Sequence, residues 1–322
     1  MKTNRNSLVT LKRMLQSAGL VSFVLALSVN APAALGAEES GKTFATPEAA
    51  VSALEAAATA CDCDALRTLF GPAAEDLQNP DRIQATNELC AFTAAIRQAK
   101  RIVRESDSRC VLEVGAESWP FPVPIVKKDG AWLFDTEAGK DEILNRRIGR
   151  NELSTLSAVR AYVEAQREYA AKDRDGDEVL EYAQMIVSTP GKKDGLYWPP
   201  ELDGEISPLG PLAAQAQSEG YGARPKKDGD EPSPFHGYFF KVIAQQAKSA
   251  PGGKYEYLIN GNMIGGFALI AWPAGYGESG IMTFIVNQQG RVYQKDLGPD
   301  TAKIAAKLKA YDPDKTWAVS PD

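Results

Sequence analysis

Apolar residues recur every three or four positions in the first part of the chain, which is the spacing of one face of a helix. This pattern predicts helices at 49–60, 64–70 and 81–100. Thr46 is a suitable N-cap and Pro47 a suitable first helical residue for the first of them.

Beyond residue 110 the spacing changes to that of short strands. Strands are predicted at 111–114, 121–126 and 132–134, with an Asp129-Gly130 turn before the last. Helices followed by a hairpin sheet predict an α+β domain at 38–147.

A second domain is predicted at 148–322. It begins with an amphipathic helix at 151–172 and continues through a loop-rich insertion at 187–235 that is rich in Gly and Pro. Shorter elements complete it: helices at 207–219 and 300–310, and strands at 238–243, 267–271, 281–286 and 291–295. The strand at 281–286 is apolar on both faces, so we expect a cover on each face, with the long helix as one of them.

The first domain resembles a known fold. The segment "AAVSALEAAATACDCDALRTLFGP" and the strand ending "KKDGAWLFD" are similar to the cone-shaped ketosteroid isomerase and SnoaL-like proteins. That resemblance implies helices on a curved antiparallel sheet and an Asp or His base inside the cone. The stretch has no His, and its candidate carboxylates, Glu113 and Glu117, fall where strand residues commonly face solvent.

The second domain is similar to the globular part of type IV pilins and pseudopilins. The similarity lies in the long helix, "HGYFFKVIA" and "FALIAWPAGYGESGIMTFIVNQQGRVYQKDLG". It implies a long helix packed on an antiparallel sheet. Filament assembly would also need an N-terminal apolar half-helix, and the first domain occupies that place.

The whole chain resembles a bacterial exported family known as domain of unknown function 2950. The residues that carry this resemblance are "NRRIGRNEL", "DGLYWP", "SPLGPLAAQA" and "VYQKDLGPDT". It implies export and an unassigned activity.

The beginning of the chain predicts a signal peptide at 1–37. Four basic residues precede an apolar run at 20–29, and small residues follow at 31–37. The run is shorter than the roughly 20 residues of a spanning helix. We therefore expect a soluble periplasmic or secreted protein with no stable membrane insertion.

Charge argues against a nucleic-acid partner. Removal of residues 1–37 leaves 32 basic against 42 acidic residues, and phosphate backbones attract a basic surface.

The four cysteines, Cys61, Cys63, Cys90 and Cys110, suit an oxidising compartment. We expect two disulfides, in which Cys61 and Cys63 each reach Cys90 or Cys110 in an undetermined order. A four-thiolate zinc site is the alternative, and it fits poorly because C-x-C replaces the paired C-x2-C knuckles of such sites.

One motif has the composition of a calcium loop. Asp173, Asp175, Asp177 and Glu181 stand at positions 1, 3, 5 and 9 of such a loop, and carboxylate oxygens are the ligands that Ca²⁺ prefers. Glu178 replaces the usual Gly, and Gln184 stands where a bidentate Glu is expected. A polar turn is the alternative, and calcium is the one candidate cofactor.

The single histidine, His236, is a weak catalytic candidate, because one His makes neither a metal site nor a triad by itself. A hydrolase or isomerase would need distant carboxylates such as Asp194, Glu278 or Asp296 to converge on it. Tyr197 and Trp198 are interpreted as anchors of a Gly/Pro loop.

The sequence thus predicts an α+β protein of unassigned activity that acts without catalysis as a binding or assembly component of the cell envelope. Its expected partner is an envelope protein or a surface polymer. The alternatives are the His236 enzyme and a calcium-stabilised adhesion module.

Overall fold

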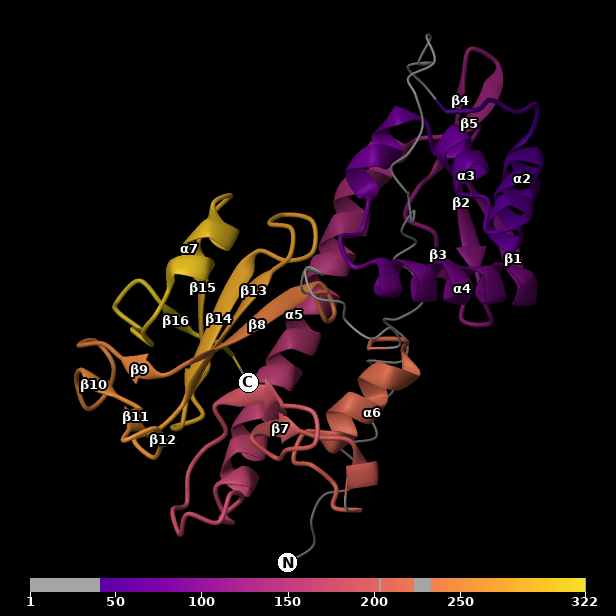
Figure 1. Ribbon diagram of the computed structural model, residues 1–322. Coiled ribbons are helices and arrows are strands. Elements are labelled where there is room, and N and C mark those ends of the chain that lie inside the picture. The colour runs from indigo at the N-terminus through magenta and orange to yellow at the C-terminus, as the bar shows by residue number, and fades with distance from the viewer. Residues whose placement is uncertain (1–40, 203, 223–232, 322) are drawn as a thin grey trace, which may run out of the picture. The chain divides into compact units, whose positions relative to one another are not determined.

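A computed structural model describes residues 41–202, 204–222 and 233–321 (Figure 1). The chain divides into two compact units, and the second begins at Asn151. The predicted signal peptide lies outside the described residues. Within the described ranges, no helix combines the length and the apolar composition that a bilayer span requires. The fold is mixed α+β with antiparallel sheets and one long helix, as the sequence predicted.

Three α-helices form one layer of unit 1: α2 (Pro47–Thr59), α3 (Cys63–Phe70) and α4 (Arg82–Gln98), with the short helix η1 (Pro72–Leu77) before α4. Each α-helix begins at a side-chain cap, from Thr46, Asp62 and Asp81 in turn, which satisfies a backbone N–H that the helix leaves open. The expected N-cap at Thr46 is therefore confirmed.

The sheet of unit 1 has the order β1-β2-β4-β5, with β3 on β2, and every pair is antiparallel. Its strands are β1 (Lys100–Ser106), β2 (Arg109–Val114), β3 (Trp119–Pro120), β4 (Ile125–Lys128) and β5 (Ala131–Phe134). β2 buries alternate residues, so one face of the sheet meets the apolar side of the helices. The rings of Phe70, Phe92, Phe121 and Phe134 pack together in this core.

All four cysteines are free thiols in this structure, which forms neither of the two expected disulfides. Cys110 is completely buried inside strand β2, whereas Cys61 and Cys90 are exposed at the end of α2 and on α4. Burial raises the pKa of the Cys110 thiol. The apolar core of unit 1 therefore packs without a cross-link.

Helix α5 (Thr136–Tyr169) contributes residues to both units and begins fifteen residues before the predicted start at 151. In unit 1 it carries Arg147, a completely buried arginine. This guanidinium donates to the carbonyl oxygens of Leu77 and Gln78 at 2.6 and 2.9 Å. The end of η1 thereby gains partners for carbonyls that a helix terminus leaves open.

Unit 2 contains a five-stranded antiparallel sheet of order β16-β15-β14-β13-β8. Its strands are β8 (Tyr238–Ile243), β13 (Ala268–Pro273), β14 (Met282–Asn287), β15 (Tyr293–Asp296) and β16 (Ala318–Val319). The central strand β14 is buried along nearly its whole length. Both faces of β14 are apolar because each face of the sheet is covered.

Helices α5 and α7 (Thr301–Lys307) lie on opposite faces of this sheet (Figure 1). Leu269 of β13 faces α5, because it lines the same groove as Tyr162 of α5. The next residue, Ile270, points to the opposite face, and so does Lys241, its partner on β8. The Lys241 ammonium donates to the carbonyl oxygens of Ala305, Ala306 and Leu308. This lysine closes the C-terminal end of α7.

The predicted loop-rich insertion contains short elements. Strand β6 (Met185–Val187) begins just before the insertion and pairs in parallel with β7 (Gly195–Tyr197). The short helices η2 (Pro200–Leu202) and α6 (Gly210–Ser218) follow. Two further hairpins follow β8: β9 (Gln245–Gln246) with β10 (Tyr255–Glu256), and β11 (Leu258–Ile259) with β12 (Asn262–Met263).

Candidate functional site

A polar pocket of about 690 Å³ lies in unit 2 beside the C-terminal end of α5. The loops around β6 and the β11–β12 hairpin complete its walls. The residues lining it are Tyr169, Arg174, Asp175, Glu181, Tyr182, Gln184, Met185, Gly191, Lys192, Lys193, Asp194, Leu202, Gly261 and Asn262.

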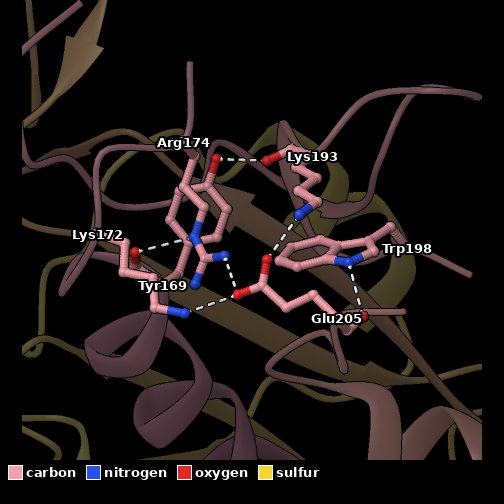
Figure 2. A network of polar contacts seen from close by, with 6 residues as sticks. All are labelled: Tyr169, Lys172, Arg174, Lys193, Trp198 and Glu205. Atoms are coloured by element: carbon pink, nitrogen blue, oxygen red, sulfur yellow. Dashed lines mark hydrogen bonds and ion pairs between the residues drawn. The ribbon is translucent and has the colours of Figure 1, made fainter. Parts of the chain in front are cut away.

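Three basic side chains next to this pocket converge on one carboxylate, that of Glu205 (Figure 2). Glu205 Oε1 accepts hydrogen bonds from Lys172 Nζ at 2.8 Å and Arg174 Nη1 at 3.0 Å, and Oε2 accepts one from Lys193 Nζ at 2.6 Å. These bonds lower the pKa of Glu205 to about 2. Glu205 is therefore ionised at neutral pH and ties three loop segments together.

The guanidinium of Arg174 lies between two aromatic rings, at 5.2 Å from the centroid of Tyr169 and 5.0 Å from that of Trp198 (Figure 2). Lys193 Nζ lies 5.4 Å from the same indole ring. Trp198 is buried and donates from Nε1 to the carbonyl of Glu205, as its interpretation as a loop anchor requires. Cation–π contacts and ion pairs thus fix one wall of the pocket.

The Tyr169 hydroxyl donates to the carbonyl of Lys193 at 2.8 Å, and burial raises its pKa to about 12. This phenol stays protonated at neutral pH. Its hydrogen bond holds the 189–194 loop against the last residue of α5 (Figure 2).

The predicted calcium loop borders the same pocket. Carboxylate oxygens of Asp173, Asp175 and Asp177 lie within 4.8 Å of one another on the surface. Asp173 accepts hydrogen bonds from the backbone N–H groups of Asp175, Gly176 and Glu178, and these bonds lower its pKa. The loop therefore brings three of the four predicted ligands together.

Glu181, the fourth predicted ligand, has a different role. Its Oε2 accepts a hydrogen bond from Met263 N at 2.8 Å, and Asn262 Nδ2 donates to Asp177 Oδ2 at 2.7 Å. Gln184 Nε2 also donates to the carbonyl of Gly261 at 2.6 Å. These three bonds hold the β11–β12 hairpin against the acidic loop, so this wall of the pocket is also fixed.

His236 packs among aromatic rings. Its ring centroid lies 4.3 Å from that of Phe235 and 5.5 Å from that of Tyr221, and its Nε2 lies 2.9 Å from a carboxylate oxygen of Glu219. The backbone at His236 has a φ of 47°, next to Gly237 at 75°. The histidine therefore belongs to a turn at the start of β8.

The carboxylates of the alternative catalytic site have other partners. Asp194 accepts a hydrogen bond from Thr189 N, and Asp296 accepts one from the hydroxyl of Tyr276. The third carboxylate, Glu278, lies in a turn next to Ser279. Ser279 is buried, and its hydroxyl donates to the carbonyl oxygens of Gly237 and Gly275, so it shapes this turn.

The two carboxylates considered in unit 1 lie outside the apolar core, Glu113 on strand β2 and Glu117 in the turn that follows it. Glu113 accepts a hydrogen bond from Arg101 Nε at 2.9 Å, and Glu117 accepts one from Trp119 Nε1 at 2.9 Å. Neither one faces the phenylalanine cluster that fills the interior.

Sequence reasoning missed the Glu205 network. Its members are spread over residues 169–205, and no spacing rule relates a glutamate in a loop to cations up to 33 positions before it. The one signal in the sequence was the pair Lys192 and Lys193, which stands just before the Tyr197-Trp198 loop.

The comparisons with known proteins bear on the family alone. A search of curated proteins and a search of solved structures each found no match, so the cone-like and pilin-like resemblances gain no support from a relative. The family model described as protein of unknown function (DUF2950) matches residues 41–319. That match covers most of the chain, and the chain therefore belongs to this family of proteins of unknown function.

Proposed function

We propose that the chain is an exported, non-catalytic binding protein of the cell envelope, and that unit 2 holds a polar surface polymer in the pocket beside α5. The signal-peptide pattern at 1–37 supports export. N-terminal sequencing of the protein from its native host tests export, because a chain that keeps its first residue contradicts it.

The observation that carries the binding proposal is the prebuilt polar wall. Glu205 and its three cations fix one side of the pocket, and the bonds of Glu181, Gln184 and Asn262 fix another. Walls that are already ordered lose little conformational entropy when a ligand binds.

The charges that line the pocket favour an uncharged, hydroxyl-rich ligand. Arg174, Lys192 and Lys193 face a similar number of acids, namely Asp175, Glu181 and Asp194. Tyr169 and Tyr182 add aromatic surface against which a sugar ring packs. Since a 150 Å³ cavity holds a benzene ring, about 690 Å³ accommodates roughly two sugar rings. The proposed ligand is therefore a neutral glycan segment.

The surroundings of His236 support a role without catalysis. Its Nε2 is paired with Glu219, and Asp194 and Asp296 have partners elsewhere. A general base needs hydrogen-bond reach to the proton that it removes, and a cleft in which substrate sits.

Isothermal titration of the full chain with neutral trisaccharides, among them N,N′,N″-triacetylchitotriose and maltotriose, tests the proposal. We expect at least one to bind with a Kd below about 1 mM. Lys192→Ala and Asp175→Asn should weaken this binding, and Lys309→Ala, an exposed residue just after α7, should leave it unchanged. Mass spectrometry should recover the sugar uncleaved. Absence of binding across the panel, or cleavage of the bound sugar, contradicts the proposal.

A calcium-stabilised adhesion module is the second candidate. The clustering of Asp173, Asp175 and Asp177 favours it, and Asp175 also lines the polar pocket. Three carboxylates supply part of the six to eight oxygens that Ca²⁺ takes, and water would supply the rest.

A further inference from the structure

We propose that unit 2 carries a second binding site, an apolar groove beneath helix α6, and that it takes an uncharged apolar molecule of about ten heavy atoms. Among the described residues, this groove shares no lining residue with the polar pocket. It is lined by Ala158, Tyr162, Ile186, Val187, Tyr197, Leu209, Leu212, Ala213, Ala216, Phe235, Phe240 and Leu269.

Helix α6 shows that the described residues around the groove do not fill it. The helix buries none of its nine residues completely, although Leu212, Ala213 and Ala216 face the groove and are half-buried. A surface helix ordinarily closes its apolar side onto the core. Here two alanines face the sheet where larger side chains would close the space.

The chemistry of the lining selects an uncharged ligand. The described lining residues are all aliphatic or aromatic, and the two hydroxyls among them are engaged. Tyr162 accepts a hydrogen bond from Gln166 at 2.9 Å, and Tyr197 accepts one from Gln217 at 2.9 Å. A charged or strongly polar ligand would lose its water without gaining partners in the groove.

The volume sets the size of the ligand. The groove measures about 270 Å³, and an apolar cavity of 150 Å³ holds benzene with its six carbons. The same proportion gives about ten or eleven heavy atoms, the size of a fused pair of aromatic rings or a medium alkyl chain. Tyr162, Phe235 and Phe240 offer ring faces and edges for an aromatic ligand.

The chain's own segment 223–232 is a poor occupant by composition. Its sequence, ARPKKDGDEP, carries six ionisable side chains, those at positions 224, 226, 227, 228, 230 and 231. Charged residues would lose their hydration in a groove that offers no polar partner. A small apolar molecule satisfies the lining better.

The test is a titration of the full chain with naphthalene and, separately, with 2-naphthalenesulfonate, in which calorimetry measures the heat of binding. We expect one naphthalene site per chain and binding of the sulfonate at least about tenfold weaker, because its charge would be buried without a partner. Failure of naphthalene to bind, or equal binding of the two compounds, overturns the proposal.

Matched variants on α6 place the site. Ala216→Phe adds a ring inside the groove and should abolish naphthalene binding while the melting temperature stays the same or rises. Ala214→Phe, on the exposed side of the same helix, should leave binding unchanged. Ala213→Leu, a smaller addition, serves if the Ala216 variant does not fold. Unchanged binding in a folded groove variant places the ligand elsewhere and overturns the proposal.

Discussion

Glu88 is an acid buried inside unit 1, with 5% of its side chain exposed and Arg150 Nη1 at 2.8 Å. Burial raises its pKa to about 7, and Arg150 and Arg147 offset part of that rise. The folded state therefore keeps a proton that the unfolded chain loses near its ordinary pKa of 4.5.

This residue predicts a pH dependence of stability. Between pH 4.5 and about 7 the folded state binds more protons than the unfolded state, so the free energy of unfolding falls as pH rises, by about 3 kcal/mol from this group. Glu88→Gln should flatten that slope. Urea unfolding at pH 5, 6 and 7.5 measures it, and an identical slope in variant and wild type would contradict the prediction.

Glu205 behaves in the opposite way, because its pKa is lowered by Lys172, Lys193 and Arg174. Its stabilisation is present above pH 4.5 and is lost as pH falls through about 2. Glu205→Gln should cost about 1–2 kcal/mol at pH 7, after allowance for solvent screening. The difference from wild type should shrink at pH 3, as measured by urea unfolding. Glu201→Gln, an exposed control four residues earlier, should change stability by less than about 0.5 kcal/mol.

Helix α5 offers a matched test at the level of one element. A Cβ at Gly139 would lie 2.8 Å from the carbonyl oxygen of Pro122 and 2.9 Å from Val123 Cα, whereas a Cβ at Gly149 would have nothing within 4 Å. Gly139→Ala should therefore destabilise unit 1 by about 1–2 kcal/mol through overpacking. Gly149→Ala should stabilise it by about 0.5–1 kcal/mol through helix propensity. Thermal unfolding of both variants decides, and equal effects would refute the close approach at Gly139.

The acidic loop makes a prediction about metal. If it binds Ca²⁺ with the Kd near 1 mM of extracellular modules, 10 mM Ca²⁺ should stabilise the fold by about 1.4 kcal/mol. Asp175→Asn together with Asp177→Asn should abolish that gain, and Mg²⁺ should give less of it. A melting temperature that does not respond to Ca²⁺, with no heat on titration, would remove the adhesion-module candidate.

The elements were predictable where local signals dominate. α2 begins at its Thr46 cap, and α3 ends at Gly71, whose φ of 69° suits a residue without Cβ. β1 was missed because this edge strand has only Ile102 and Val103 as apolar residues. The early start of α5 was missed because Gly139 and Gly149 weaken the helical pattern.

At the scale of the whole molecule, the sequence predicted the α+β class but only part of the site. It singled out the acidic loop because those residues are adjacent in sequence. It expected disulfides because four cysteines occur together, yet Cys110 is taken up by the core. The Glu205 network and the groove under α6 depend on contacts between distant segments, which local patterns do not encode.

The most direct test of the central claim is hydrogen exchange of the full chain with and without the tightest-binding neutral trisaccharide. We expect exchange to slow at 169–194 and at 261–262, around the polar pocket, and the sugar to be recovered intact. Protection confined to other segments, or a cleaved sugar, would contradict it.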